Sequence, residues 1–199
     1  MIFGRPHSPT FAKISTPETR DSTYEEMKSY RKALQKTVAS LSNSALGAVT
    51  WEISRDEGIH IHWQFIPFPA KLVSQGLVEA ALQVEAENEK YPAFECKDIG
   101  NGSQNKTDYL RLWLWRPTLP TNTGESEDLL SGDGKSLVLE LDHETRFDLQ
   151  FPRKCMAKLL GLEKRFHWKD CAQSEAEEAA EAEVFKSAFK PFDFSLEEE

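Results

Sequence analysis

Apolar side chains recur every three or four residues between positions 24 and 41, and this spacing predicts a helix with one buried face. The members of this stripe are Tyr24, Met27, Tyr30, Leu34, Val38 and Leu41. Ser22 precedes the stripe, and Glu25 follows Ser22 by three residues as in a capping box, so we expect the helix to begin near Ser22. Residues 1–20 are rich in Pro, Ser and Thr and predict irregular structure.

Two strands and a second helix are expected next. Residues 46–54 and 59–66 are rich in β-branched and aromatic side chains and are joined by a polar turn, which predicts an antiparallel hairpin. Pro67 and Pro69 are expected to end the second strand, because proline lacks the N–H that a sheet ladder uses. Apolar spacing then predicts a helix over about 71–87.

The second half of the chain predicts a smaller mixed segment that begins after Tyr91. Its expected elements, in order, are strands at 109–115, 137–141 and 146–151, a short helix at 152–160 and an acidic helix from Ser174. Ser174 opens a second capping box, and Val184, Phe185, Ala188 and Phe189 are expected to face inward on this last helix. The polar stretch at about 118–136 is expected to be an insertion within the segment.

Composition and charge narrow the classes of function. Hydrophobic residues make up 39% and charged residues 29% of the 199 residues, as in a globular protein without a membrane span. The net charge is −9, and residues 174–199 contribute nine acidic residues against two lysines. Because phosphate neutralisation needs a basic surface, a protein that holds nucleic acid by itself is not expected. The acidic segment is either solvated or docks a basic protein partner. The start lacks the apolar core of a signal peptide, so a nuclear or cytoplasmic location is expected.

The predicted strand at 59–66 carries the candidate chemistry. Successive side chains of a strand point to opposite faces, so His60, His62 and Gln64 share one face, and Ile61 and Trp63 share the other. Same-face neighbours repeat at about 6.6 Å, so the three polar groups span a length that suits a phosphate or a short phosphodiester. Imidazole attacks or protonates phosphoryl groups near neutral pH. The same spacing is also typical of a strand with one solvated face, and both interpretations stay open.

No metal site and no cofactor are expected. His60 and His62 supply two ligands, but no nearby Asp, Glu or Cys at a useful spacing completes a tetrahedral set. The cysteines, Cys96, Cys155 and Cys171, have no metal-ligand spacing either.

The strand and its surroundings resemble a known family. His60-Ile61-His62-Trp63-Gln64 resembles the His-φ-His-φ-Gln form of the histidine-triad motif, where φ is an apolar residue. The wider stretch at 47–69 is similar to the CwfJ-type C-terminal region. Residues 151–171 and 185–195 are similar to a second block that defines the same proteins. The blocks occur in the family's order and extend over nearly the whole chain.

This resemblance implies an α+β fold with two parts. Residues 1–91 would form a truncated, histidine-triad-like antiparallel sheet with helices, whose N-terminal strands are expected to be missing, and residues 92–199 a small α+β CwfJ-type C-terminal domain. By position in the motif, His62 would be the nucleophile-equivalent histidine, His60 the first member, and Gln64 the replacement of the third. His7 matches a substrate-binding histidine that follows an early strand in such folds.

The resemblance also implies a function in the nucleus. It indicates a non-catalytic factor in pre-mRNA splicing and intron-lariat turnover, which contacts spliceosomal proteins and the lariat debranching enzyme and reaches branched RNA through a complex. The alternative is a histidine-triad nucleotide hydrolase or transferase, in which His62 attacks an α-phosphate and forms a covalent histidine–nucleotidyl intermediate. The missing strands and the acidic charge favour the non-catalytic factor, whereas the intact His60/His62 pair favours the enzyme. The oligomeric state stays open.

Overall fold

In the computed structural model of the protein, the described residues are 1–4, 8–55, 60–98, 108–117 and 134–196. Their strands are β1 (Ile2–Phe3), β2 (Leu46–Ser54), β3 (His62–Pro69), β4 (Glu95–Cys96), β5 (Asp108–Trp115) and β6 (Lys135–Leu141). Their α-helices are α1 (Pro17–Leu41), α2 (Ala70–Ser74), α3 (Leu77–Asn88), α4 (Phe151–Leu159) and α5 (Glu175–Phe189). Short 3₁₀ helices are η1 (Phe11–Lys13), η2 (Glu163–Arg165), η3 (Trp168–Cys171), η4 (Lys190–Phe192) and η5 (Phe194–Leu196).

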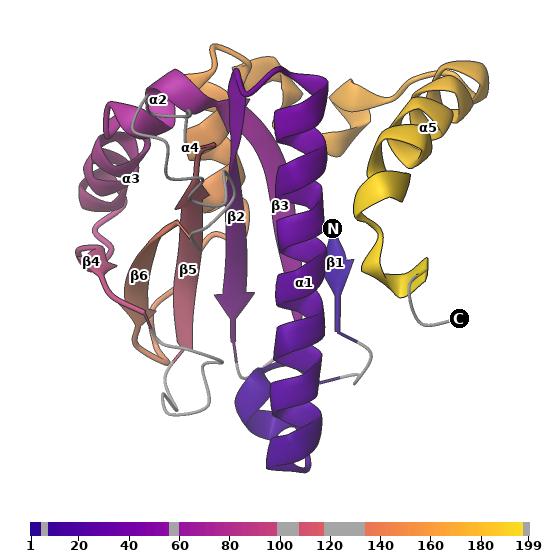
Figure 1. Cartoon of the computed structure of the whole chain (residues 1–199). Coiled ribbons are helices and arrows are strands. Elements are labelled where there is room, and N and C mark those ends of the chain that lie inside the picture. Colours follow the sequence, from indigo (N-terminus) through magenta and orange to yellow (C-terminus); the bar gives the residue numbers. More distant parts are fainter. Residues whose placement is uncertain (5–7, 56–59, 99–107, 118–133, 197–199) are drawn as a thin grey trace, which may run out of the picture.

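Within these residues the strands form one antiparallel sheet in the order β1-β3-β2-β5-β6-β4, which confirms the predicted α+β class. Helix α1 lies across one face, and α4 lies on the other (Figure 1). The α1 face buries an aromatic cluster that includes Tyr24, Trp63 and Trp113. The opposite face buries the larger core, in which side chains of β2, β5 and β6 pack against α3 and α4. The strands on either side of the expected boundary after Tyr91 belong to this one sheet, because β5 pairs with β2 along its length.

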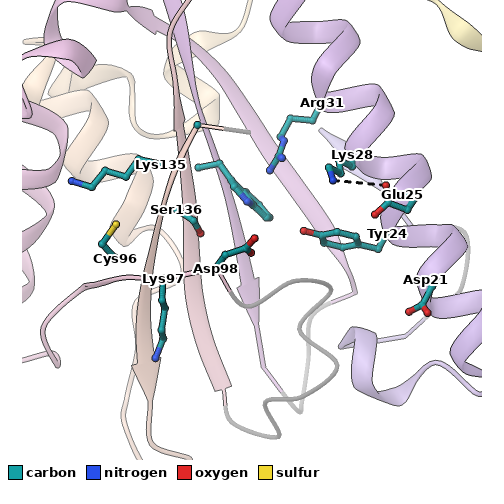
Figure 2. Close-up of a pocket in the computed structure, with 12 residues that line it drawn as sticks. Asp21, Tyr24, Glu25, Lys28, Arg31, Cys96, Lys97, Asp98, Lys135 and Ser136 are labelled. Atoms are coloured by element: carbon teal, nitrogen blue, oxygen red, sulfur yellow. Dashed lines mark ion pairs between the residues drawn. The ribbon is translucent and has the colours of Figure 1, made fainter. Parts of the chain in front are cut away.

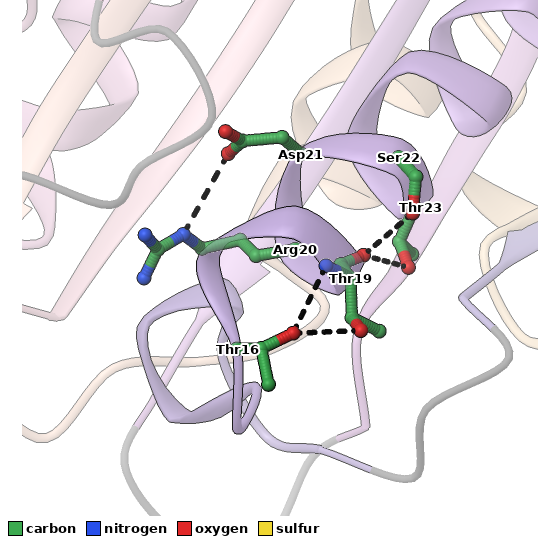
Figure 3. A network of polar contacts seen from close by, with 6 residues as sticks. All are labelled: Thr16, Thr19, Arg20, Asp21, Ser22 and Thr23. Atoms are coloured by element: carbon green, nitrogen blue, oxygen red, sulfur yellow. Dashed lines mark hydrogen bonds and ion pairs between the residues drawn. The ribbon is translucent and has the colours of Figure 1, made fainter.

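Helix α1 begins at Pro17, so the expected start near Ser22 is wrong. Thr16 is the N-cap, and its hydroxyl accepts a hydrogen bond from the Thr19 backbone N–H at 3.2 Å (Figure 3). Pro17 suits the first helical position because its fixed φ is already helical and its missing N–H needs no partner there. Ser22 lies inside the helix and donates its hydroxyl hydrogen to the Thr19 carbonyl.

Strand β3 continues through Pro67 and Pro69, which were expected to end it. Among the described residues, β3 pairs with β1 only at His62 and Trp63, so the rest of the strand has an open edge on that side. In an edge strand, every second residue points its backbone nitrogen away from the neighbouring strand, so a proline there costs no ladder hydrogen bond. Pro67 and Pro69 are two residues apart, so both can occupy such positions. They therefore occupy the strand without breaking its ladder to β2.

Three other expectations need correction. The helix expected over 71–87 is two helices, α2 and α3, separated at Gly76, whose φ of 71° favours glycine. Residues 146–150 form no strand, and the outer side of β6 pairs with β4 instead. The capping box at Ser174 is confirmed, but α5 fully buries no residue: Val184 is 62% exposed and Phe185 is 44% exposed, whereas Ala188 and Phe189 are partly buried.

Two expectations fall outside the described residues. These are His7 and most of the polar insertion, residues 118–133. The remainder of that stretch ends in Lys135 and Ser136, which open β6.

Candidate functional site

The structure brings His62 and Gln64 together on β3. The side-chain nitrogen of Gln64 lies 3.4 Å from Nε2 of His62, and Nδ1 of His62 lies 2.8 Å from the carbonyl oxygen of His60. A carbonyl oxygen only accepts, so we assign the hydrogen to Nδ1 and the lone pair to Nε2, which faces the Gln64 amide. His60 precedes the strand, is exposed, and orients the His62 ring with its backbone. The described contacts thus join His62 to Gln64 through their side chains and His62 to His60 through the His60 carbonyl.

The alternation predicted for this strand is confirmed on its other face. Ile61 and Trp63 are buried against α1, where the Trp63 ring packs on Tyr24 and Trp113. The tryptophans of the sheet, Trp51, Trp63, Trp113 and Trp115, are all buried in the folded protein. Each is at most 3% exposed, so packing in the core accounts for them.

A buried carboxylate joins three strands beneath α1. Glu52 on β2 accepts hydrogen bonds from Arg111 at 2.8 Å, from the Tyr109 hydroxyl at 2.9 Å and from the Trp63 indole at 3.1 Å. Burial, and then the Glu52 charge, raise the pKa of Tyr109 well above its ordinary value, so its hydroxyl stays a donor. Burial alone would lower the pKa of Arg111, but Glu52 and the two nearby tyrosines raise it, so the guanidinium stays charged.

Sequence reasoning missed this network. Its only signals are single charged residues inside apolar strands, Glu52 between Trp51 and Ile53 and Arg111 between two leucines. A buried charge requires a partner, so these positions point to an ion pair between strands even though they do not identify it.

A cavity of about 630 Å³ lies on the α1 face, and none of its described lining residues belongs to β3 (Figure 2). Arg31 of α1 reaches into it and stacks on Trp113, with 4.3 Å between the guanidinium carbon and the ring centroid. Its charged lining is mixed: Lys28, Arg31, Lys97 and Lys135 against Asp21, Glu25 and Asp98. Lys97 and Lys135 also pair with glutamates of the surrounding surface, so the lining shows no excess that selects one sign of ligand charge.

A second cavity, of about 340 Å³, lies on the histidine side of the sheet. Gln64 of β3 and Trp51 of β2 line it from the sheet. Arg153 of α4 and Arg165 of η2 line it from the second half of the chain. This cavity therefore adjoins the His62–Gln64 pair, and we call it the α4 cavity.

The described residues contain no group of three His, Cys, Asp or Glu side chains that could hold a metal ion. Burial raises the pKa of the Cys155 thiol to about 12, so this cysteine stays protonated and is a poor ligand or nucleophile. In the same part of the chain, no helix is both long enough and apolar enough to cross a bilayer.

The fold and site define a class: an antiparallel α+β protein with a His-φ-His-φ-Gln segment whose second half covers the histidine side of the sheet. Residues 7–80 match the family described as protein similar to CwfJ C-terminal, and residues 86–195 match the family described as protein similar to CwfJ C-terminus 2. The chain belongs to this CwfJ C-terminal family, which confirms the resemblance inferred from its sequence.

Curated relatives come from fungi, animals and a plant. The chain is 37% identical to the CWF19-like protein mug161 of Schizosaccharomyces pombe over 175 residues, which are 88% of this chain and 27% of that protein. It is 30% identical to the CWF19-like protein DRN1 of Saccharomyces cerevisiae, over 75% of this chain and 30% of that protein. It is 28% identical to the zinc finger CCCH domain-containing protein 64 of Arabidopsis thaliana, over 84% of this chain and 26% of that protein. The chain thus spans less than a third of each of these relatives.

Proposed function

We propose that this chain is a non-catalytic module of a nuclear factor that acts in pre-mRNA splicing and assists intron-lariat turnover beside the debranching enzyme. The observation that carries the proposal is the family match, which extends over both halves of the chain. Relatives named CWF19-like support a splicing-related role. Because the chain spans less than a third of those proteins, the partners of the whole protein belong to the proposal.

The acidic surface of helix α5 favours binding to a protein partner rather than direct binding to RNA. Helix α5 carries glutamates at 175, 177, 178, 181 and 183 on an element that buries no residue. Val184 and Phe185 are exposed on the same helix. An acidic helix with exposed apolar side chains suits a basic protein surface and repels a phosphate backbone.

A specific observation favours the second candidate, a nucleotide hydrolase or transferase. The Nδ1–H bond to the His60 carbonyl leaves the lone pair of His62 on Nε2, the nitrogen that would attack. In such a step Nε2 forms a bond to the α-phosphorus while the bond to the leaving phosphate oxygen breaks. Water would then cleave the N–P bond and release the nucleotide, and the Gln64 amide would hold a phosphate oxygen in both steps.

The two candidates are separated by assays on the complete protein. Wild type, His62→Ala and the control His143→Ala, an exposed turn residue, are each incubated with labelled dinucleoside polyphosphates and with capped or branched RNA. We expect all three proteins to be equally inert and to bind the debranching enzyme equally well. Turnover by wild type and His143→Ala that disappears in His62→Ala would replace the non-catalytic account with the enzymatic one.

A further inference from the structure

The α4 cavity is built by both halves of the chain. The sheet side is formed by β2 and β3, and the opposite side by α4, η2 and the residues between them. Its apolar wall includes Ile66, Met156 and Leu162, and its polar groups are Gln64, Arg153 and Arg165. At about 340 Å³ it falls within the usual range of about 300–1,000 Å³ for small-ligand sites.

The charge of this cavity is unlike that of the chain. The protein has 33 acidic and 24 basic residues, yet no Asp or Glu of the described residues lines the α4 cavity. No carboxylate of the described residues forms an ion pair with Arg153 or Arg165. The neighbouring α4 lysines, Lys154 and Lys158, do pair, with Asp148 and Glu85. Two guanidinium groups beside one apolar cavity therefore keep their capacity to bind an anion.

The chemistry of the lining selects the kind of anion. A guanidinium offers parallel N–H donors that match two oxygens of a phosphate. The apolar wall suits the flat face of a ring, and the Gln64 amide both donates and accepts, as recognition of a base edge or a ribose hydroxyl requires. A ligand with one phosphate and one flat ring that has polar groups at its edge would match the guanidinium groups, the apolar wall and the Gln64 amide.

We propose that the α4 cavity binds a single RNA nucleotide, with its phosphate on Arg153 and Arg165 and its base against the apolar wall. The site needs both halves, because β3 supplies Gln64 and the second half supplies the arginines. It shares Gln64 with the motif, its described lining includes neither His60 nor His62, and it does not depend on the proposed splicing role. The α4 cavity would thus allow a chain of net charge −9 to bind, at one local site, RNA that a partner protein brings to it.

Titration of the whole chain with nucleoside 5′-monophosphates tests this proposal. Binding is followed by NMR through the side-chain N–H signal of Trp51, which lines the cavity and is assigned with a Trp51→Phe variant. Arg153→Gln and Arg165→Gln should each weaken monophosphate binding by about tenfold, because each removes a charge-assisted contact. Arg146→Gln, which alters an exposed arginine outside the cavity, should leave binding unchanged.

Control ligands show which results would contradict the proposal. Unphosphorylated nucleosides should bind more weakly than monophosphates, and with no dependence on either arginine. Equal affinity of all four proteins for monophosphates would overturn the proposal. So would inorganic phosphate that binds as tightly as the nucleotides, or a phosphoserine peptide that binds more tightly with the same arginine dependence. Thermal unfolding of each variant shows whether a loss of binding reflects a loss of fold.

Discussion

At the scale of single residues, Glu52 connects the three neighbouring strands β3, β2 and β5 through its side chain. It is 2% exposed and links β2 to Trp63 on β3 and to Tyr109 and Arg111 on β5. The Arg111 side chain is fully buried, so its charge is removed from bulk solvent. Removing one partner of a buried pair costs far more than the pair contributes, because it leaves the other charge uncompensated.

Glu52→Gln should therefore lower the free energy of unfolding by about 3–5 kcal/mol, measured by urea denaturation. Glu140→Gln is the matched control, since it removes a carboxylate that pairs with Lys97 on the surface, and it should cost less than about 1 kcal/mol. Similar losses for both variants would show that Glu52 does not stabilise the sheet in this way.

Residue-level prediction from the sequence succeeded where a pattern is local. The alternation of Ile61 and Trp63 with His62 and Gln64 was predictable, because side chains of a strand alternate by geometry. The Glu52 network was not predictable, because its partners on β5 come 57 and 59 residues later in the chain. The α4 cavity was missed for the same reason: Arg153 and Gln64 meet only after the second half folds onto the sheet.

At the scale of elements, the start of α1 shows how two capping signals compete. Ser22 with Glu25 matches the capping-box pattern, but Thr16 followed by Pro17 caps the helix. The proline was the signal that could have found the true start, because it is favoured in the first turn and disfavoured further in. The corresponding box at Ser174, with no competing cap before it, was predicted correctly.

Thr16→Ala should destabilise the protein by about 1 kcal/mol, because the Thr19 N–H loses its acceptor. Ser22→Ala should change the free energy of unfolding by less than about 0.5 kcal/mol, since Ser22 is an exposed residue within the helix. Thermal or urea unfolding measures both. If Ser22→Ala lowered the free energy of unfolding more than Thr16→Ala, the result would indicate that the helix begins at Ser22 after all.

At the scale of the whole molecule, the two halves share one sheet. The pairing of β2 with β5 joins segments on either side of the expected boundary after Tyr91, and α4 covers the face that carries His62 and Gln64. Hydrophobic patterns identified most strands but not their order, because strand order depends on contacts between distant residues. The family resemblance implied the α+β class and related both halves to one family, since it rests on blocks in both halves, but it did not supply the strand order.

The central claim is that the chain serves intron-lariat turnover without chemistry at His62. The most direct test measures excised intron lariats in cells that lack the complete protein and are complemented with wild type, His62→Ala or His143→Ala. We predict that deletion raises lariat levels and that all three proteins restore them equally. Lariat accumulation with His62→Ala, at the level of the deletion and with normal protein abundance, would contradict the claim and assign His62 a catalytic role.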